Sequence, residues 1–378
     1  MKKVPRLRFR GFSEEWEQCK LGDLGSVAMN KRIFKEQTSE SGDIPFYKIG
    51  TFGATADAFI SRELFETYKK KYPYPKIGDL LISASGSIGR VVEYKGNDEY
   101  FQDSNIVWLK HDDRINNLFL KQFYSIVKWH GLEGSTIKRL YNKNILETTI
   151  HLPVFDEQEK IGTLFKQLDD IITLHQRKLE QLKELKKAYL QLMFPKKDET
   201  LPRVRFADFE GEWEQCKLKN LFLKGGSGGT PTSSNSDYYN GDIPFLSISD
   251  ITKSNGYIYT TEKCISLEGL KNSSAWIVPK ESISLAMYAS VGKVAILKLD
   301  IATSQAFYNM IFEDINTRNY IYHYLIKKEV FNEWITLIST GTQANLNADK
   351  VKNTFVLIPS NNEQKKNSRV IKMHRSIY

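Results

Sequence analysis

The sequence predicts an α+β protein: two repeated α/β domains, separated by one long helix of the coiled-coil type, with a second long helix largely missing. Two observations predict this arrangement. First, the segment 5–21 returns as 202–218, so that Trp213 matches Trp16 at an offset of about half the 378-residue chain. Solenoid repeats have periods of about 20–50 residues, so this longer period indicates two duplicated domains. Second, neither Pro nor Gly occurs from Thr163 to Phe194, between the two copies.

Each copy begins with the tryptophan segment and continues with matched β-rich segments. The sequence Gly-Asp-Ile-Pro-Phe occurs at 42–46 and again at 241–245, and predicts a turn that enters a strand. The segments 77–92 and 278–295 each predict a strand, a turn of small residues and a second strand. Both turns end on a glycine followed by a cation, at Gly89-Arg90 and Gly292-Lys293.

The second part of each copy predicts a helix, a polar loop and a short β-rich segment. The predicted helices are Leu118–His130 and Asn319–Trp334, and the polar loops are 134–139 and 341–345. The β-rich segments end at Pro153 and Pro359. Other loops differ between the copies, because the basic segment Asn30–Lys35 corresponds to the glycine-rich segment Gly225–Thr232. One frame with two sets of loops indicates two modules with the same task and different targets.

A long helix is predicted over 153–195, between the first domain (1–152) and a short linker (196–200). Asp156 to Glu159 resembles a capping box. At about 1.5 Å per residue, thirty-odd residues make a rod of about 50 Å, and its apolar stripe requires a covering partner. An ordinary core helix is the alternative. The heptad positions proposed for helix packing or a subunit interface are Ile161, Leu164, Leu168, Ile171, Leu182, Leu185 and Leu192.

The second domain is predicted over 201–359, and the long helix is expected to be truncated after it. The segment 359–366 matches 153–160, but the remaining residues, 367–378, keep only half of the apolar stripe. Nothing corresponds to 173–194. We therefore expect a truncated distal helix over 360–378, and an exposed stripe on the first long helix.

Composition limits the classes of function. The net charge of +9 favours a polyanionic partner, although a solvated basic surface explains it equally well. No apolar segment approaches about 18 residues, and Glu14 and Glu15 stand where a signal peptide needs apolar residues, so we expect a cytoplasmic protein. Cys19, Cys216 and Cys264 form neither a disulfide framework nor a zinc motif. We expect Cys19 and Cys216 to fill the same core position twice.

The sequence contains no recognisable catalytic or cofactor motif. The segment 225–229 lacks the Gly-Lys-Ser/Thr ending of a phosphate loop, and no dinucleotide fingerprint or nucleophile elbow occurs. The loops instead carry cations, amides and hydroxyls of the kinds that contact DNA phosphates and base edges. For each residue alone, an exposed side chain without a partner is the simpler interpretation. The candidates are Lys48, Arg90, Gln102, Asn105, Lys138 and Arg139 in the first copy and Ser247, Tyr288, Lys293, Gln305, Gln343 and Asn345 in the second.

The order of these motifs resembles that of the DNA-specificity subunits of type I restriction-modification systems. The matching segments are 16–24, 42–46, 87–89, 152–158 with the long helix, 228–231 and 241–245. The resemblance implies two target-recognition domains, each reading one half of a bipartite, asymmetric double-stranded DNA site. It implies partners, usually two methyltransferase (modification) subunits together with restriction subunits, which carry all catalysis. Independently of the resemblance, the missing cofactor motifs and metal-ligand spacings predict no cofactor and no metal in this chain.

Other interpretations remain open at this stage. Within the same class, the chain is alternatively the specificity partner of a fused restriction–methylation enzyme, or a poorly functional truncated allele. A coiled-coil scaffold that binds proteins is the alternative from another class, and a self-sufficient methyltransferase is a third. Because the partner helix is missing, a homodimer through the central helix is also expected.

Overall fold

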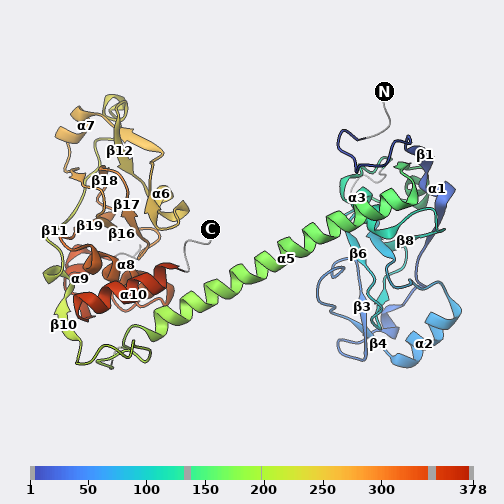
Figure 1. The fold of residues 1–378 in the computed structure, drawn as a ribbon, viewed down its shortest axis with the longest axis horizontal. Helices are drawn as coiled ribbons and strands as arrows, with labels where there is room; N and C mark the ends of the chain where they lie inside the picture. The colour runs from blue at the N-terminus through green and yellow to red at the C-terminus, as the bar shows by residue number, and fades with distance from the viewer. Residues whose placement is uncertain (1–4, 132–137, 197, 339–345, 374–378) are drawn as a thin grey trace. The chain divides into compact units, whose positions relative to one another are not determined.

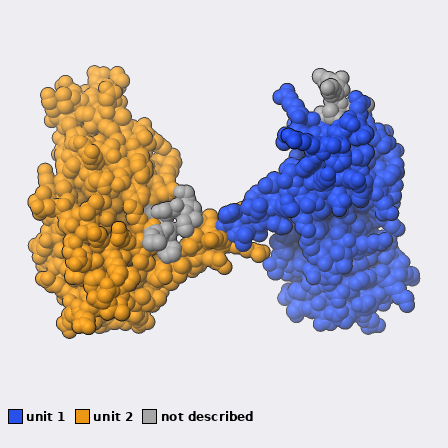
Figure 2. Space-filling view, in the orientation of Figure 1, with its two compact units in different colours: residues 1–175 blue, residues 176–378 orange. Residues whose placement is uncertain are grey.

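A computed structural model describes residues 5–131, 138–196, 198–338 and 346–373. The chain divides into two compact units, 1–175 and 176–378 (Figure 2). The boundary falls within the long helix α5 (Phe155–Leu192), which runs from one unit into the other (Figure 1). The units are mixed α/β, as the sequence predicts, and each is described separately below.

Unit 1 contains three small sheets. Its four-stranded sheet has the order β2 (Gly25–Ala28), β8 (Ile106–His111), β5 (Leu80–Ser83) and β6 (Val91–Glu93). A three-stranded sheet has the order β4 (Phe59–Ile60), β3 (Ile44–Tyr47) and β7 (Tyr100–Phe101), and β1 (Glu17–Lys20) pairs with β9 (Thr149–Leu152). The helices are α1 (Leu21–Leu24), η1 (Lys35–Gln37), α2 (Arg62–Lys71), α3 (Asn117–Ile126) and α4 (Asn142–Leu146).

Unit 2 repeats this topology with two added strands. Its larger sheet has the order β11 (Lys224–Ser227), β19 (Phe307–Ile311), β16 (Ile283–Ala286), β17 (Val294–Leu297) and β13 (Tyr257–Ile258). The second sheet has the order β14 (Lys263–Ile265), β12 (Ile243–Leu246), β18 (Ile301–Thr303) and β15 (Ile277–Val278), and β10 (Glu214–Lys217) pairs with β20 (Phe355–Ile358). The helices are η2 (Leu218–Asn220), η3 (Ser236–Tyr239), α6 (Ile248–Lys253), α7 (Leu267–Lys271), α8 (Ile315–Val330), α9 (Ala348–Lys352) and α10 (Asn361–Met373).

The two copies agree down to the register of their outer strands. Cys19 lies opposite Ile150 in the β1–β9 pair, and Cys216 lies opposite Val356 in the β10–β20 pair. Both cysteines are half-buried, and burial raises the pKa of each thiol. They therefore occupy equivalent positions, although neither is fully enclosed in a core.

The predicted helix ends were wrong by several residues. The helix predicted to end at His130 ends at Ile126, because Val127 adopts an extended backbone with ψ 135°. The helix predicted to begin at Asn319 begins at Ile315, where the Asp314 carboxylate accepts a hydrogen bond from the Thr317 amide. Asp314 supplies the cap that the apolar periodicity could not locate.

The long helix is confirmed, and its start is fixed differently from the prediction. Helix α5 begins at Phe155, so Asp156 lies in its first turn instead of capping it. The Glu157 carboxylate is fully buried and accepts two hydrogen bonds of 2.7 Å from the Arg8 guanidinium. The Gln158 side-chain amide donates to the Pro153 carbonyl at 3.0 Å. The helix start is thus fastened to the N-terminal segment of its own unit.

Unit 2 uses the same fastening at the start of α10. Glu363 is buried and accepts hydrogen bonds of 2.8 and 3.0 Å from Arg205. Gln364 donates to the Pro359 carbonyl at 2.8 Å. Arg8 and Arg205 are repeat-equivalent, so the repeated Glu-Gln sequence has a structural role in both copies.

The two ends of α5 are packed, whereas its middle is exposed. Ile161 packs against the core of unit 1, and Leu190 lies in the core of unit 2. Between them, Leu164, Leu168 and Ile171 are 42%, 44% and 50% exposed. Within the described residues, nothing covers this part of the predicted stripe.

Candidate nucleic-acid interface

In each unit, three loop segments meet at one end of one sheet, the four-stranded sheet of unit 1 and the five-stranded sheet of unit 2. In unit 1, the turn between β5 and β6 (84–90) lies against the turn between β7 and β8 (102–105), because the Ala84 amide donates to the Asn105 carbonyl at 2.7 Å. The chain that leaves the polar loop joins them, with the Leu140 amide donating to the Ala84 carbonyl at 2.8 Å. We call 84–90 the small-residue turn of unit 1.

Unit 2 makes the same meeting point from equivalent residues. The Met287 amide donates to the Ala306 carbonyl at 2.7 Å, and the Leu346 amide donates to the Met287 carbonyl at 3.0 Å. The small-residue turn of unit 2 is therefore 287–293, beside the β18–β19 turn (304–306). The repeated frame brings three loops together in both units.

A glycine and a tryptophan hold each small-residue turn. Gly89 has a φ of +82° and Gly292 has a φ of +90°, a region that favours glycine. A Cβ atom on Gly89 would lie 2.7 Å from Nε1 of Trp129, and one on Gly292 would lie 2.5 Å from Cδ1 of Trp334. The cation after each glycine, Arg90 or Lys293, is therefore presented from a tightly packed turn.

Several predicted residues of unit 1 gather at this end. The Ser85 hydroxyl donates to the Asn105 side-chain oxygen at 2.8 Å, and the Arg139 guanidinium donates to the Ser104 carbonyl at 3.0 Å. Arg90 donates to the Phe52 carbonyl at 2.7 Å and is otherwise exposed. Lys138 is exposed immediately before Arg139. This end of unit 1 combines cations with amide and hydroxyl groups.

Two further candidates in unit 1 are engaged within the fold. Lys48 forms an exposed ion pair of 2.9 Å with Asp57. The Gln102 side-chain oxygen accepts a hydrogen bond of 2.8 Å from the Ile49 amide, which ties the β7–β8 turn to the segment after β3. Gln102 therefore shapes the loop instead of offering its acceptor at the surface.

The candidate residues of unit 2 carry less positive charge than those of unit 1. Lys293 pairs with Glu329 at 2.7 Å, and Tyr288 is partly exposed beside it in the small-residue turn. The Gln305 side-chain oxygen accepts a hydrogen bond of 2.7 Å from Thr230. Ser247 caps α6, since its hydroxyl binds Asp250 in both directions, and this local role accounts for its hydrogen bonds. Gln343 and Asn345 lie outside the described residues.

Two residues at this end were missed as individual candidates. Arg32 donates from Nε to the Asp103 carboxylate at 2.9 Å, and Thr230 reaches the corresponding turn of unit 2. Both lie in the loops that differ most between the copies, which is the signal that could have found them.

Each unit has a cavity at the equivalent place, lined by residues next to the tryptophan that packs against its small-residue turn. A cavity of about 620 Å³ in unit 1 is lined by Lys128, Asn144 and Thr148, and one of about 1250 Å³ in unit 2 is lined by the equivalent Glu333, Lys350 and Thr354. In unit 2, Lys327 and Lys328 approach Glu333 at 2.7 and 3.6 Å. Burial lowers the pKa of Lys328, although Glu333 opposes this shift.

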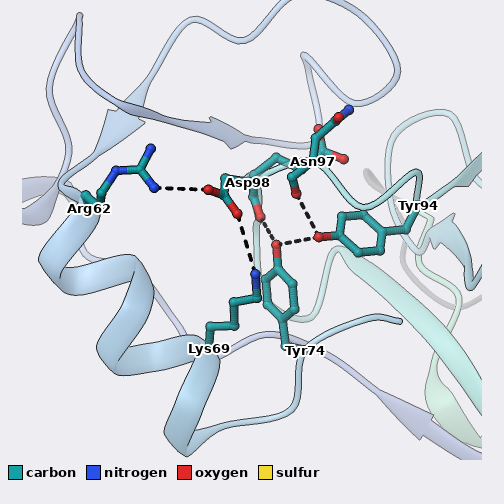
Figure 3. A network of polar contacts seen from close by, with 7 residues as sticks. Arg62, Lys69, Tyr74, Tyr94, Asn97 and Asp98 are labelled. Atoms are coloured by element: carbon teal, nitrogen blue, oxygen red, sulfur yellow. Dashed lines mark hydrogen bonds and ion pairs between the residues drawn. The ribbon is translucent and has the colours of Figure 1, made fainter. Parts of the chain in front are cut away.

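A second polar network lies on unit 1, beside helix α2 (Figure 3). Asp98 accepts from Arg62 at 3.0 Å and pairs with Lys69 at 3.5 Å. The Tyr74 hydroxyl donates to the Glu99 carbonyl at 2.5 Å and lies 3.2 Å from the Tyr94 hydroxyl oxygen. Arg62 and Lys69 are paired with Asp98 in this network, away from the three loops of the candidate interface.

Over the described part of the chain, no cluster of His, Cys, Asp and Glu side chains has the arrangement of a metal site. No described helix is long and apolar enough to cross a membrane.

A family model described as the type I restriction modification DNA specificity domain matches the chain twice, at residues 13–184 and 210–376. A Haemophilus influenzae protein named "Putative type I restriction enzyme specificity subunit S.HindORF215P" is 55% identical over 152 residues, which are 40% of each chain. The Methanocaldococcus jannaschii "Type I restriction enzyme MjaIX specificity subunit" is 34% identical over 163 residues, which are 42% of this chain and 37% of that one. The chain thus spans about two fifths of the length of these curated relatives.

Solved structures share the fold along nearly the whole chain. The crystal structure of a type I restriction-modification system S subunit from M. genitalium matches with a TM-score of 0.60 and 14% identity, and covers 99% of this chain and 92% of that one. A second structure, titled "Structural basis underlying complex assembly and conformational transition of the type I R-M system", matches with a TM-score of 0.55 and 14% identity, over 97% of this chain and 91% of that one. At this identity the likeness concerns the fold alone.

Proposed function

The chain belongs to the type I restriction modification DNA specificity family, and from this premise we propose that it is a non-catalytic subunit that recognises a bipartite, asymmetric DNA sequence. The observation that carries the proposal is the repeated meeting of three loops on one frame, with different side chains in the two copies. Cations, amides and hydroxyls at these loops suit phosphates and base edges.

Each unit would act as one target-recognition domain and read one half of the site. Unit 1 offers Arg90, Lys138 and Arg139, whereas unit 2 offers Tyr288 and Lys293. Base identity is read by hydrogen bonds and apolar contacts from side chains. The two units share a fold but carry different side chains in their loops, so we expect them to read different half-sites. The gap between the half-sites would be on the order of one DNA turn, centre to centre.

Methylation and cleavage would be carried by partner subunits. Modification subunits, usually two, and restriction subunits would assemble on this chain. The exposed stripe at Leu164, Leu168 and Ile171 supports helix α5 as a docking element, because an apolar surface of this kind marks an interaction site. A homodimer through α5 is the alternative cover.

Binding measurements separate this function from its rivals. The full chain should bind duplex DNA with an affinity that falls as salt rises, and should not bind the methyl donor. A protein-binding scaffold would show no DNA binding at low salt, and a self-sufficient methyltransferase would bind the methyl donor in calorimetry. Either result would refute the proposal.

A further inference from the structure

The loop 30–37 of unit 1, called here the basic loop, is fastened beside the candidate interface. The Lys31 carbonyl accepts a hydrogen bond of 3.0 Å from the buried Tyr100, and Ile33 packs against a core cluster. The Arg32 Nε donates to Asp103 at 2.9 Å, at the β7–β8 turn. Because residues 103–105 also contact Ser85 and Arg139, Arg32 and the small-residue turn flank the same short segment.

The fastening leaves the cations of the basic loop available. Lys31, Arg32 and Lys35 are all exposed, and the Arg32 side chain is 59% exposed although it is paired. Among the described residues, the guanidinium bonds only through Nε, so its two terminal NH₂ groups remain available as donors. The Lys31 ammonium lies 5.3 Å from the Tyr72 ring centroid, and the Lys71 ammonium approaches the same ring at 5.7 Å.

Unit 2 places no cation at the same position. The short helix η3 corresponds to η1, and the loop before it, 229–235, contains neither Lys nor Arg. Where Arg32 pairs with Asp103, Thr230 donates to Gln305 at 2.7 Å. In both units a side chain of this loop bonds the equivalent turn, β7–β8 in unit 1 and β18–β19 in unit 2. The bond is an ion pair in unit 1 and a neutral hydrogen bond in unit 2.

We propose that the basic loop grips the DNA sugar-phosphate backbone beside the half-site of unit 1, and that unit 2 has no equivalent grip. This inference rests on the proposed function and refines it. Arg32 and Lys35 are the principal phosphate contacts. Lys31 in the loop and Lys71 at the end of α2, which share the Tyr72 ring, extend them. Asp103 limits the grip, because its carboxylate neutralises part of the Arg32 charge and repels phosphate. Most of the salt dependence of binding should therefore arise in unit 1.

The test is the salt dependence of binding to a fluorescent duplex of about 40 base pairs of random sequence. The logarithm of the binding constant K falls as log[salt] rises. Each lost phosphate contact should reduce the steepness of this fall, called here the salt slope, by about 0.9. The double variant Arg32→Ala with Lys35→Ala should lower the slope by about 1–2 units and weaken binding on the order of tenfold per lost contact near 0.1 M salt. Arg32→Gln with Lys35→Gln should behave alike if the alanine variant does not fold.

Two further variants make the result specific. Lys95→Ala with Lys110→Ala removes the same charge from the opposite end of the sheet strands, and should leave the slope unchanged. Asp103→Asn should steepen the salt slope and tighten binding, because it frees the Arg32 guanidinium from its ion pair with the carboxylate. An unchanged slope in the loop variants, or an equal fall in the control, would overturn the inference while leaving the proposed function standing. Failure of the unmodified chain to bind DNA at low salt would overturn both.

Discussion

At the residue scale, many candidates chosen for their chemistry turn out to support the fold. Gln102 and Ser247 carry groups that could contact bases, yet each is satisfied by a nearby backbone or side-chain partner. The repeated motif located both small-residue turns, which lie between the predicted strands in each unit. It could not separate exposed from satisfied side chains, since that depends on partners such as Ile49 and Asp250, whose proximity only folding decides.

Glycine at the end of each small-residue turn should be required for stability. Gly89→Ala places a Cβ in a left-handed backbone region and within 2.7 Å of the Trp129 ring. We expect a loss of about 1–3 kcal/mol from the backbone conformation, with a further loss from the contact. Gly86→Ala is the matched control, since φ there is +63° but its Cβ would meet no atom closer than 3.5 Å. Equal denaturation midpoints for the two variants would contradict the packing account.

The cations that follow these glycines should contribute to DNA binding. If Arg90 reads a base, Arg90→Ala should cost about 1–3 kcal/mol of binding free energy and relax one position of the site. If it contacts a phosphate, binding should weaken evenly over sequences and the salt slope should fall by about one unit. Fluorescence anisotropy on a panel of duplexes distinguishes these results. Unchanged affinity in both Arg90→Ala and Lys293→Ala would remove the turns from the interface.

The network beside α2 predicts a pH response. The hydrogen bond from Arg62 holds the pKa of the Asp98 carboxyl below its usual range, and Lys69 adds to this effect. A carboxyl with a depressed pKa in the folded state stabilises the fold above its ordinary pKa, and this contribution is lost as pH falls through the depressed value. Arg62→Ala should raise the Asp98 pKa in a carboxyl NMR titration. An Asp98 pKa that does not change in this variant would show that the ion pair does not form in solution.

At the element scale, the long helix was predictable and its attachment was not. The segment that resembles a capping box, the heptad pattern from Ile161 and the absence of Pro and Gly from 163 to 194 together identified α5 to within three residues at each end. The pattern could not reveal that Glu157 and Glu363 are buried against arginines of the N-terminal segments, because Arg8 lies 149 residues from its partner. A charged residue near the start of a helix is more often exposed to solvent than buried. From the sequence alone, Glu157 and Glu363 would therefore be expected at the surface, whereas both are buried.

The apolar stripe of α5, which continues past its exposed middle to the half-buried Leu182 and to Leu185, should direct association. We expect the isolated chain to be a dimer or insoluble, and Leu182→Glu with Leu185→Glu to release monomer or abolish assembly with the modification subunits. Thr173→Glu with Gln176→Glu adds the same charge outside the a and d positions, and should leave association intact. Light scattering would report the mass of each variant. A soluble monomer of the unmodified chain at micromolar concentration would contradict this account.

At the scale of the whole molecule, duplication was the decisive signal. The matched segments predicted two domains, and the strand orders of the two units agree except for the added β13 and β15. Those additions could not be foreseen, because Tyr257–Ile258 and Ile277–Val278 are two-residue strands without periodicity. The target bases could not be predicted from the sequence either, because they depend on the geometry of the contacts that the loops make with the base edges.

The most direct test of modular recognition is to map methylated sites in cells that carry this chain with its modification subunit. Residues 25–150 would be exchanged for the first domain of another family member, with the frame segments and α5 retained. The account predicts a bipartite methylated sequence in which the exchange changes one half and preserves both the other half and the gap. A change in both halves, or the same site before and after the exchange, would contradict it.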